Sequence, residues 1–316
     1  MTHRLNVLLL VLLTMIGAPY LWLFVLTPTR EVRPQSVNMA ELRGLAATRL
    51  GPRPDGVELT VVGWRLVPAN VYAAGAGMKR KLLAAISFRL PVAGSGPVII
   101  DTGMSRKLAA KASFSRFLPS RQAAVDADLR SASLILATSE QPEHLGGLAV
   151  FASRPESAVA LTRAKLNPHQ VPATTADDHI PWPAGLALRA GIPGQRAVAV
   201  APGVVVIPAP GPSPGSQMIY VHLNDGREYL FAGDIAPFAI NFQELRTGSN
   251  LLKWFWLPQD RAAVMRWLVT IRALQREAPG LIVLPGHDFE WITDARSKTG
   301  ARAVEVPGTP AKPAGT

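Results

Sequence analysis

Apolar and β-branched residues occur in short runs along the first half of the chain, and these runs predict the strands of a sheet. Residues 58–66 and 82–90 alternate partly between apolar and polar side chains, as strands with one buried face do. A Gly- and Pro-rich turn at 94–97 leads into another apolar run. Residues 106–117 and 121–129 contain Ala, Leu, Lys and Arg without Gly or Pro, so we expect two helices there.

The second half of the chain predicts another set of strands and one long helix. Apolar residues at close to helical spacing in 259–276 predict an amphipathic helix, which Pro279 and Gly280 end before a short strand at 281–284. Asn224-Asp225-Gly226 is a typical hairpin turn between two strands. The strands expected before the helix are 204–209, 218–224 and 228–231.

The composition of two segments predicts little regular structure in them. The Pro-rich segment 167–185 is a loop by composition, and it contains His169 and His179. Residues 298–316 are rich in Pro and Gly, so we expect a disordered tail.

Residues 5–26 form an apolar run without a charged residue. At ~1.5 Å per residue such a helix spans about 33 Å, enough to cross the hydrocarbon core of a bilayer. A secretory signal peptide is the alternative, but its apolar region is usually shorter and no cleavage motif of small residues follows Leu26. The run therefore predicts an uncleaved single-pass anchor, which in a bacterium would lie in the inner membrane.

The side of the membrane that carries the rest of the chain stays open. Arg4 precedes the run, whereas Arg30, Arg33 and Arg43 follow it, and the positive-inside rule then places the domain in the cytoplasm. Long domains translocate largely regardless of charge, which allows the opposite orientation. The absence of cysteine excludes a disulfide framework and suits either side.

The net charge of +11 raises the question of a nucleic-acid partner. The basic residues are scattered, and only Lys79-Arg80-Lys81 form a run. We therefore expect no nucleic-acid partner and assign the charge to attraction toward anionic lipid headgroups beside the anchor. The aromatic group Trp254-Phe255-Trp256 most commonly indicates core packing, with a substrate mouth or a membrane contact as alternatives.

Polar residues with metal-ligating side chains follow an apolar strand at 134–137. The sequence continues as Thr138, Ser139, Glu140, Gln141, Pro142, Glu143 and His144, and then reaches Gly146-Gly147 at the start of an apolar helix. The segment resembles the T-H-x-H-x-D-H-x-G-G loop of the metallo-β-lactamase superfamily, with both of its first two histidines replaced.

Four further segments resemble landmarks of the same superfamily, in the same order. They are a strand ending in Asp101-Thr102-Gly103, a turn at 209–216 similar to P-G-H-T-P-G-S, a strand end at 230–234 similar to F-x-G-D, and Pro285-Gly286-His287. We identify the chain on these residues as a member of the superfamily, resembling its glyoxalase II and lactonase branch.

The resemblance implies an α/β fold, the four-layer αββα sandwich, preceded here by one transmembrane helix. We expect an anchor and linker at 1–34, the metallo-β-lactamase-like domain at 35–297, and the tail at 298–316.

The resemblance also implies where metal ions would bind. The positions of three first-metal histidines are Ser139, Gln141 and Pro212, none of which has an imidazole, so we expect the first site to hold no metal. The second-metal positions are Glu143, His144, Asp234 and His287, all of which can bind a metal. Asp101 corresponds to the residue that orients one of the ligands.

Two imidazoles and two carboxylates suit one zinc, iron or manganese ion. Such a set leaves three alternatives open. The ion can be catalytic, with Asp234 as a general base for water; it can be structural, because four protein ligands fill a tetrahedral shell; or no metal binds. His169 and His179 are possible replacement ligands, although exposed loop histidines are far commoner.

Two functions therefore remain open. The first is a membrane-anchored metal-dependent hydrolase, at most mononuclear, that cleaves a small-molecule ester, lactone, thioester or phosphoester. The second is a catalytically inactive pseudoenzyme that binds a partner or acts as a scaffold at the membrane.

Overall fold

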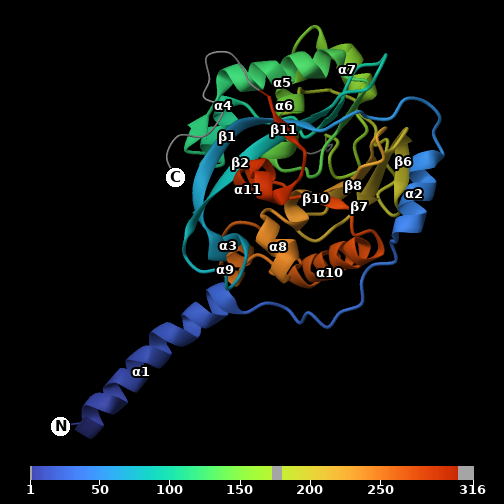
Figure 1. Ribbon diagram of the computed structural model, residues 1–316. Helices are drawn as coiled ribbons and strands as arrows, with labels where there is room; N and C mark the ends of the chain where they lie inside the picture. The colour runs from blue at the N-terminus through green and yellow to red at the C-terminus, as the bar shows by residue number, and fades with distance from the viewer. Residues whose placement is uncertain (1, 173–179, 305–316) are drawn as a thin grey trace.

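Two β-sheets lie face to face at the centre of the computed structural model, which describes residues 2–172 and 180–304 (Figure 1). The first sheet has the strand order β11-β1-β2-β3-β5, and β4 pairs with β1 as well. Its strands are β1 (Glu58–Pro68), β2 (Arg80–Leu90), β3 (Val98–Ile100), β4 (Arg116–Phe117), β5 (Leu134–Leu136) and β11 (Arg302–Ala303).

The second sheet has the strand order β10-β9-β8-β7-β6. Its edge pair β9–β10 is parallel, like β3–β5 in the first sheet. Its strands are β6 (Val198–Ala201), β7 (Val204–Pro208), β8 (Gln217–His222), β9 (Glu228–Phe231) and β10 (Ile282–Leu284).

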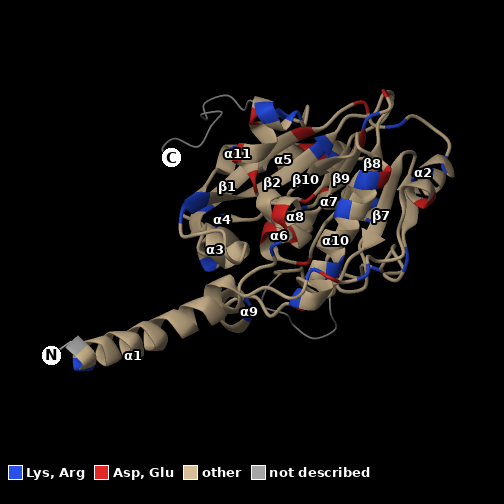
Figure 2. Cartoon of the chain, turned by 60° about the horizontal axis from the view of Figure 1, so that its bottom comes forward, with Lys and Arg blue, Asp and Glu red and all other residues tan. Residues whose placement is uncertain are grey.

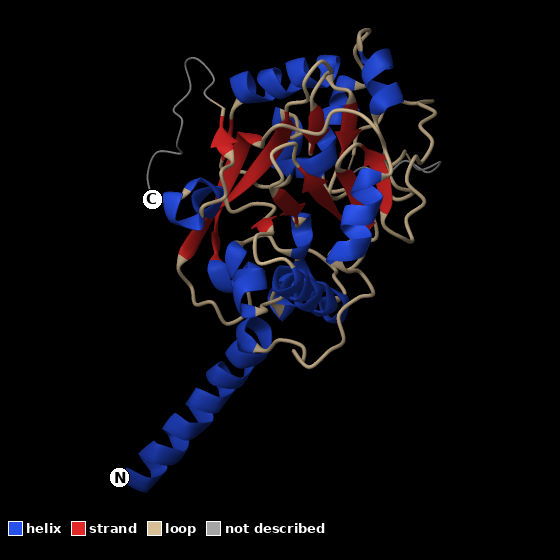
Figure 3. Cartoon of the chain, turned by 45° about the vertical axis from the view of Figure 1, so that its right-hand side comes forward, coloured by secondary structure: helices blue, strands red, loops and turns tan. Residues whose placement is uncertain are grey.

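Helices cover the outer face of each sheet, as Figure 3 shows. One group packs on the first sheet: α4 (Arg106–Lys111), α5 (Pro119–Ser131), α6 (Pro142–Phe151) and α7 (Ser157–Arg163). The other group packs on the second sheet: α2 (Met39–Ala47), α8 (Ala239–Glu244) and α10 (Arg261–Glu277). The expected αββα sandwich is therefore confirmed.

The core between the sheets is formed by the side chains that the alternating strands direct inward. Phe88 of β2 meets Phe231 of β9 in an edge-to-face contact with ring centroids 4.9 Å apart. On the outer face of the second sheet, helix α10 likewise buries its apolar side chains. Asp260 caps it by accepting from the amides of Ala262 and Ala263, and one stripe of apolar residues, including Leu268, is buried.

The N-terminal helix projects away from the sandwich as a rod (Figures 1 and 3). It consists of α1 (Thr2–Tyr20), which contains Pro19, and a π-helical turn, η1 (Leu21–Val25). Within the 23 residues His3–Val25, the most apolar window of 18 residues has a mean hydropathy of 2.3, and none of it is buried. Within the described residues, this is the one helix long and apolar enough to cross a membrane.

The end of this helix is hydrogen-bonded to the sandwich. The amide of Gly75 donates to the Phe24 carbonyl at 2.8 Å, and the side-chain amide of Asn250 donates to the Trp22 carbonyl at 2.8 Å. The Arg261 guanidinium donates to the carbonyl of Leu26. Two short helices, α3 (Ala69–Tyr72) and α9 (Asn250–Phe255), flank this junction.

Three expectations differ from the structure, and each difference has a physical cause. Helix α4 ends early because Ser113 adopts φ +58, and Arg116–Phe117 then pair with β1, where Gly63 has no side chain to collide with the Arg116 carbonyl. Disorder was expected from residue 298, but Arg302–Ala303 extend the first sheet beside β1. Residues 305–316 lie outside the described part.

The aromatic group at 254–256 was expected to pack in the core, and this prediction was wrong. Trp254, Phe255 and Trp256 are 63%, 68% and 65% exposed. They lie at the end of α9, beside the junction with the N-terminal helix, where the sandwich offers no surface to cover them.

Candidate metal centre

The candidate site lies where the parallel strand pairs of both sheets end. Parallel strands place the loops that follow them at one edge, which is where open α/β sheets bind ligands. Asp101 follows β3, His144 lies in the first turn of α6 after β5, Asp234 follows β9 in the short 3₁₀ turn η2 (Gly233–Ile235), and His287 follows β10.

Asp101 holds the ring of His144 in place. One carboxylate oxygen of Asp101 accepts from the Thr138 amide at 2.6 Å, and the other accepts from the Thr138 hydroxyl at 2.8 Å. The second oxygen also lies 2.9 Å from His144 Nδ1, which donates to it. This contact leaves His144 Nε2 free of a proton in the neutral ring and directs it toward Asp234.

His287 is oriented in the same way by the backbone. Its Nδ1 donates to the carbonyl of Ala84 at 2.8 Å, so Nε2 of the neutral ring is an acceptor. That Nε2 atom lies 2.9 Å from Asp234 Oδ1, and His144 Nε2 lies 3.3 Å from the same oxygen. The two rings meet edge to face with centroids 5.0 Å apart.

Three acceptor atoms therefore converge in a buried space. His144 Nε2 and Asp234 Oδ2 are also buried without a hydrogen-bond partner among the described residues. Buried acceptors that face one another require a proton or a cation between them. The donor set of two imidazoles and a carboxylate fits a divalent transition metal.

The directions in which the pKa values of His144 and Asp234 shift also indicate that a positive charge is favourable here. Burial lowers the pKa of His144, but the carboxylates of Asp101 and Asp234 outweigh burial and raise this pKa well above its ordinary value. Burial raises the pKa of Asp234, but His144 and His287 lower it well below its ordinary value. A positive charge, as a proton or as a metal ion, is thus stabilised between these groups.

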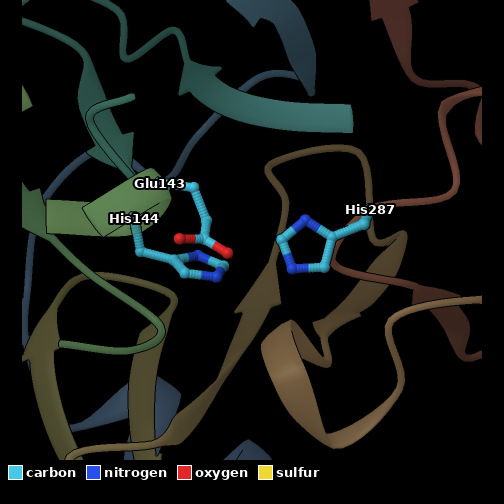
Figure 4. A group of neighbouring side chains, drawn as sticks. All are labelled: Glu143, His144 and His287. Atoms are coloured by element: carbon cyan, nitrogen blue, oxygen red, sulfur yellow. The ribbon is translucent and has the colours of Figure 1, made fainter. Parts of the chain in front are cut away.

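Glu143 completes the group. Figure 4 shows its carboxylate beside the ring of His144, with His287 facing both. Ligating atoms of Glu143, His144 and His287 lie within 4.8 Å of one another. Glu143 is partly exposed, whereas His144 and His287 are each 2% exposed, so water reaches the group from the Glu143 side.

One of the three positions expected to lack first-metal ligands, Ser139, belongs to a different network. Ser139 is fully buried, and its hydroxyl lies 3.4 Å from the Ser213 hydroxyl. Ser213 donates to the Glu140 carboxylate at 2.6 Å, and the Gly215 amide donates to it at 3.0 Å. A side chain at Gly215 would collide with Glu140. Protein groups thus satisfy one another at this end of the site.

Sequence reasoning missed Glu140 and Ser213. Their contact joins positions 73 residues apart, and only the replacement of neighbouring histidines by small or amide residues hinted at it. Gln141 and Pro212 make no side-chain hydrogen bond among the described contacts, and Gln141 lines the cavity described next. His169 is exposed and belongs to no group of potential ligands in the described part, and His179 lies outside it.

A cavity of about 730 Å³ opens from the candidate metal centre. Glu143, Asp234 and His287 line its inner end together with Tyr72 and Arg65. Arg65 donates to the Tyr72 hydroxyl at 2.7 Å. Burial and the nearby carboxylates raise the pKa of Tyr72 against the effect of Arg65, so the phenol stays protonated and can donate to a ligand. The sequence contained no signal for this pair.

No family model matches the sequence, and no curated protein is similar enough to match it. Solved structures are similar. A quorum-quenching N-acyl homoserine lactone lactonase has a TM-score of 0.56 at 14% identity, covering 77% of this chain and 95% of that one. A probable metal-dependent hydrolase from Staphylococcus aureus has a TM-score of 0.53 at 15% identity, covering 76% and 91%.

An N-acyl homoserine lactone hydrolase with its product bound at the catalytic metal centre has a TM-score of 0.54 at 14% identity, covering 75% of this chain and 95% of that one. At 14–15% identity, these similarities show that the chain has the fold of these metal-dependent hydrolases.

Proposed function

We propose that the chain is a membrane-anchored hydrolase of the metallo-β-lactamase fold with one metal ion at Glu143, His144, Asp234 and His287. The observation that carries the proposal is the convergence of His144 Nε2, His287 Nε2 and Asp234 Oδ1 in a buried space that opens into a cavity. Zinc, iron and manganese all suit this set.

The bound ion would polarise the substrate and lower the pKa of a bound water. The chain's own residues do the rest. Asp101 and the carbonyl of Ala84 orient the two imidazoles. The carboxylate of Asp234 is a proton acceptor beside the cavity, and the Tyr72 hydroxyl donates to a substrate oxygen. The reaction adds water across an ester, lactone, thioester or phosphoester bond and releases an acid and an alcohol or thiol.

A structural ion or an inactive scaffold is the second candidate. The network of Glu140, Ser213 and Ser139 favours it, because this network closes the end of the site where the resemblance places the first metal. A hydrolase that works with one ion needs an open coordination position, and four protein ligands in a tetrahedral shell would leave none.

Elemental analysis of the full-length protein, purified in mild detergent without chelator, tests the proposal. We expect about one metal equivalent in the wild type and in the control His169→Ala, which changes an exposed loop histidine. His144→Ala and His287→Ala should lose the metal and the turnover of ester, lactone and thioester substrates together. A folded, metal-free wild type would overturn the proposal, whereas bound metal without turnover would favour the scaffold.

A further inference from the structure

The cavity that starts at the candidate metal centre has buried and exposed lining residues. Its inner wall includes His287, which is 2% exposed. Its outer wall includes Phe24 of η1 and Trp256, which is 65% exposed. Most of the other lining residues are aliphatic: Val67, Pro68, Val71, Leu83, Leu108, Leu251, Leu252 and Leu257. The exposed Lys111, Ser113 and Ser115 also line the cavity, at and after the end of α4. One mouth of the cavity, the one bordered by Phe24 and Trp256, therefore lies at the foot of the N-terminal helix.

Aromatic side chains surround this mouth. Trp254, Phe255 and Trp256 are each more than 60% exposed, and three adjacent exposed aromatics mark an interaction surface. The ring of Trp254 lies 6.4 Å from that of Trp22, at the end of the apolar helix. The aromatic surface at 254–256 is thus continuous with the helix, and Trp is the residue that membrane interfaces favour.

Hydrogen bonds hold the mouth and the helix in one arrangement. Gly75 binds the carbonyl of Phe24, Asn250 binds that of Trp22, and Arg261 binds that of Leu26. A bilayer around the N-terminal helix would therefore contact the surface of the sandwich that surrounds this mouth.

Charge agrees with this placement. Lys253 lies on α9 with its ammonium 5.7 Å from the Trp254 ring, and Lys79 and Arg80 are exposed on the segment that follows Gly75. Figure 2 shows that Lys, Arg, Asp and Glu are absent along α1 after its first turn. An apolar rod that ends at basic and aromatic side chains is the pattern of an anchor at an anionic headgroup layer.

We propose that the lipid bilayer covers the aromatic surface at 254–256, and that the cavity takes up an amphiphile with a long acyl chain from the bilayer. The acyl chain lies along the aliphatic wall, and the polar carbonyl end reaches Tyr72 and Glu143. The volume of about 730 Å³ lies within the range of small-molecule pockets. The cleavage of this amphiphile rests on the proposed function, whereas its binding does not.

Photo-crosslinking tests the proposal on the full-length protein in vesicles of phosphatidylethanolamine and phosphatidylglycerol. The probe is a palmitic acid with a diazirine in the middle of its chain, added at a few per cent of the lipid. Mass spectrometry should find label on residues 251–257 and on the cavity wall at 66–72, besides the helix. Leu50, which is 95% exposed after the end of α2, should stay unlabelled.

A variant with a charge at the mouth separates uptake from chance contact. Leu257→Asp should lower the label on 66–72 by about tenfold, because a carboxylate is costly in an apolar passage. The matched control Leu50→Asp should leave it unchanged, and the label on the N-terminal helix serves as the internal standard in both.

Label confined to the helix would overturn the membrane surface, and label on 251–257 without label on 66–72 would overturn the acyl substrate. Crosslinking needs no turnover, so a labelled cavity in a protein that hydrolyses nothing would refute the proposed function and leave this inference standing.

Discussion

Asp101 orients His144, a proposed metal ligand, without itself being one of the proposed ligands. Its backbone lies in the left-handed region at φ +62, and its carboxylate bonds to Thr138 and His144 together. Asn tolerates the same backbone, so Asp101→Asn removes the charge and keeps the shape. We expect metal affinity to fall by about 10–100-fold, because the imidazole loses the acceptor that orients it.

Competition with a chromophoric chelator measures this effect. Asp128→Asn is the matched control, because Asp128 pairs with Arg89 away from the candidate centre. Equal metal affinity in Asp101→Asn and the wild type would mean that Asp101 does not position His144.

Sequence reasoning reached the residues that stand in short motifs but not their partners. Glu143, His144 and His287 follow predicted strands next to Gly-rich turns, so their positions could be expected to meet at one edge. The contact between Glu140 and Ser213 joins segments whose spacing has no periodicity. The pairing of Arg65 with Tyr72 depends on how β1 continues into α3, and the sequence has no signal for it.

At the scale of elements, an ion pair attaches α2 to the second sheet. Arg43 on α2 donates twice to the carboxylate of Glu228 on β9, at 2.8 and 2.7 Å, and Tyr220 on β8 donates to the same carboxylate. These hydrogen bonds hold the pKa of Glu228 below its ordinary value against the opposing effect of burial. The pair therefore contributes stability while Glu228 is ionised in the folded protein.

The lowered pKa of Glu228 determines how the stability that this ion pair contributes depends on pH. A group with a lowered folded pKa contributes its full stability above the unfolded pKa, ~4.3 for Glu, and loses it as pH falls through the folded pKa. Glu228→Gln should cost about 1–2 kcal/mol at neutral pH, and the difference from wild type should shrink below pH 4.3. Urea unfolding at several pH values checks this. A cost that does not change with pH would indicate lost packing instead.

Elements with their own periodicity were predictable, and elements defined by a distant partner were not. The long helix was expected at 259–276 and lies at Arg261–Glu277, because its apolar stripe and its Asp260 cap are local signals. β4 and β11 are two residues each and exist only because β1 offers them an edge. Whether 254–256 faced the core or the solvent depended on where the N-terminal helix joins the sandwich.

For the whole molecule, the important feature is the fixed junction between the N-terminal helix and the sandwich. A flexible tether would let the cavity mouth point in any direction, whereas the hydrogen bonds from Gly75, Asn250 and Arg261 set one orientation. Arg261 is central because its guanidinium reaches both Leu26 and Asn250 while it is 8% exposed.

Replacing Arg261 should therefore free the helix without unfolding the sandwich. In Arg261→Ala, the carbonyl of Leu26 loses its donor, the end of the helix separates more often from α3 and α9, and the Gly75 amide is exposed to exchange. We expect hydrogen exchange in the segment that contains Gly75 to accelerate by about tenfold. The control Arg276→Ala removes an exposed arginine from α10, the helix that also contains Arg261, and should leave exchange unchanged. If both variants exchange like the wild type, Arg261 does not hold the junction, and the orientation of the mouth toward a membrane loses its structural basis.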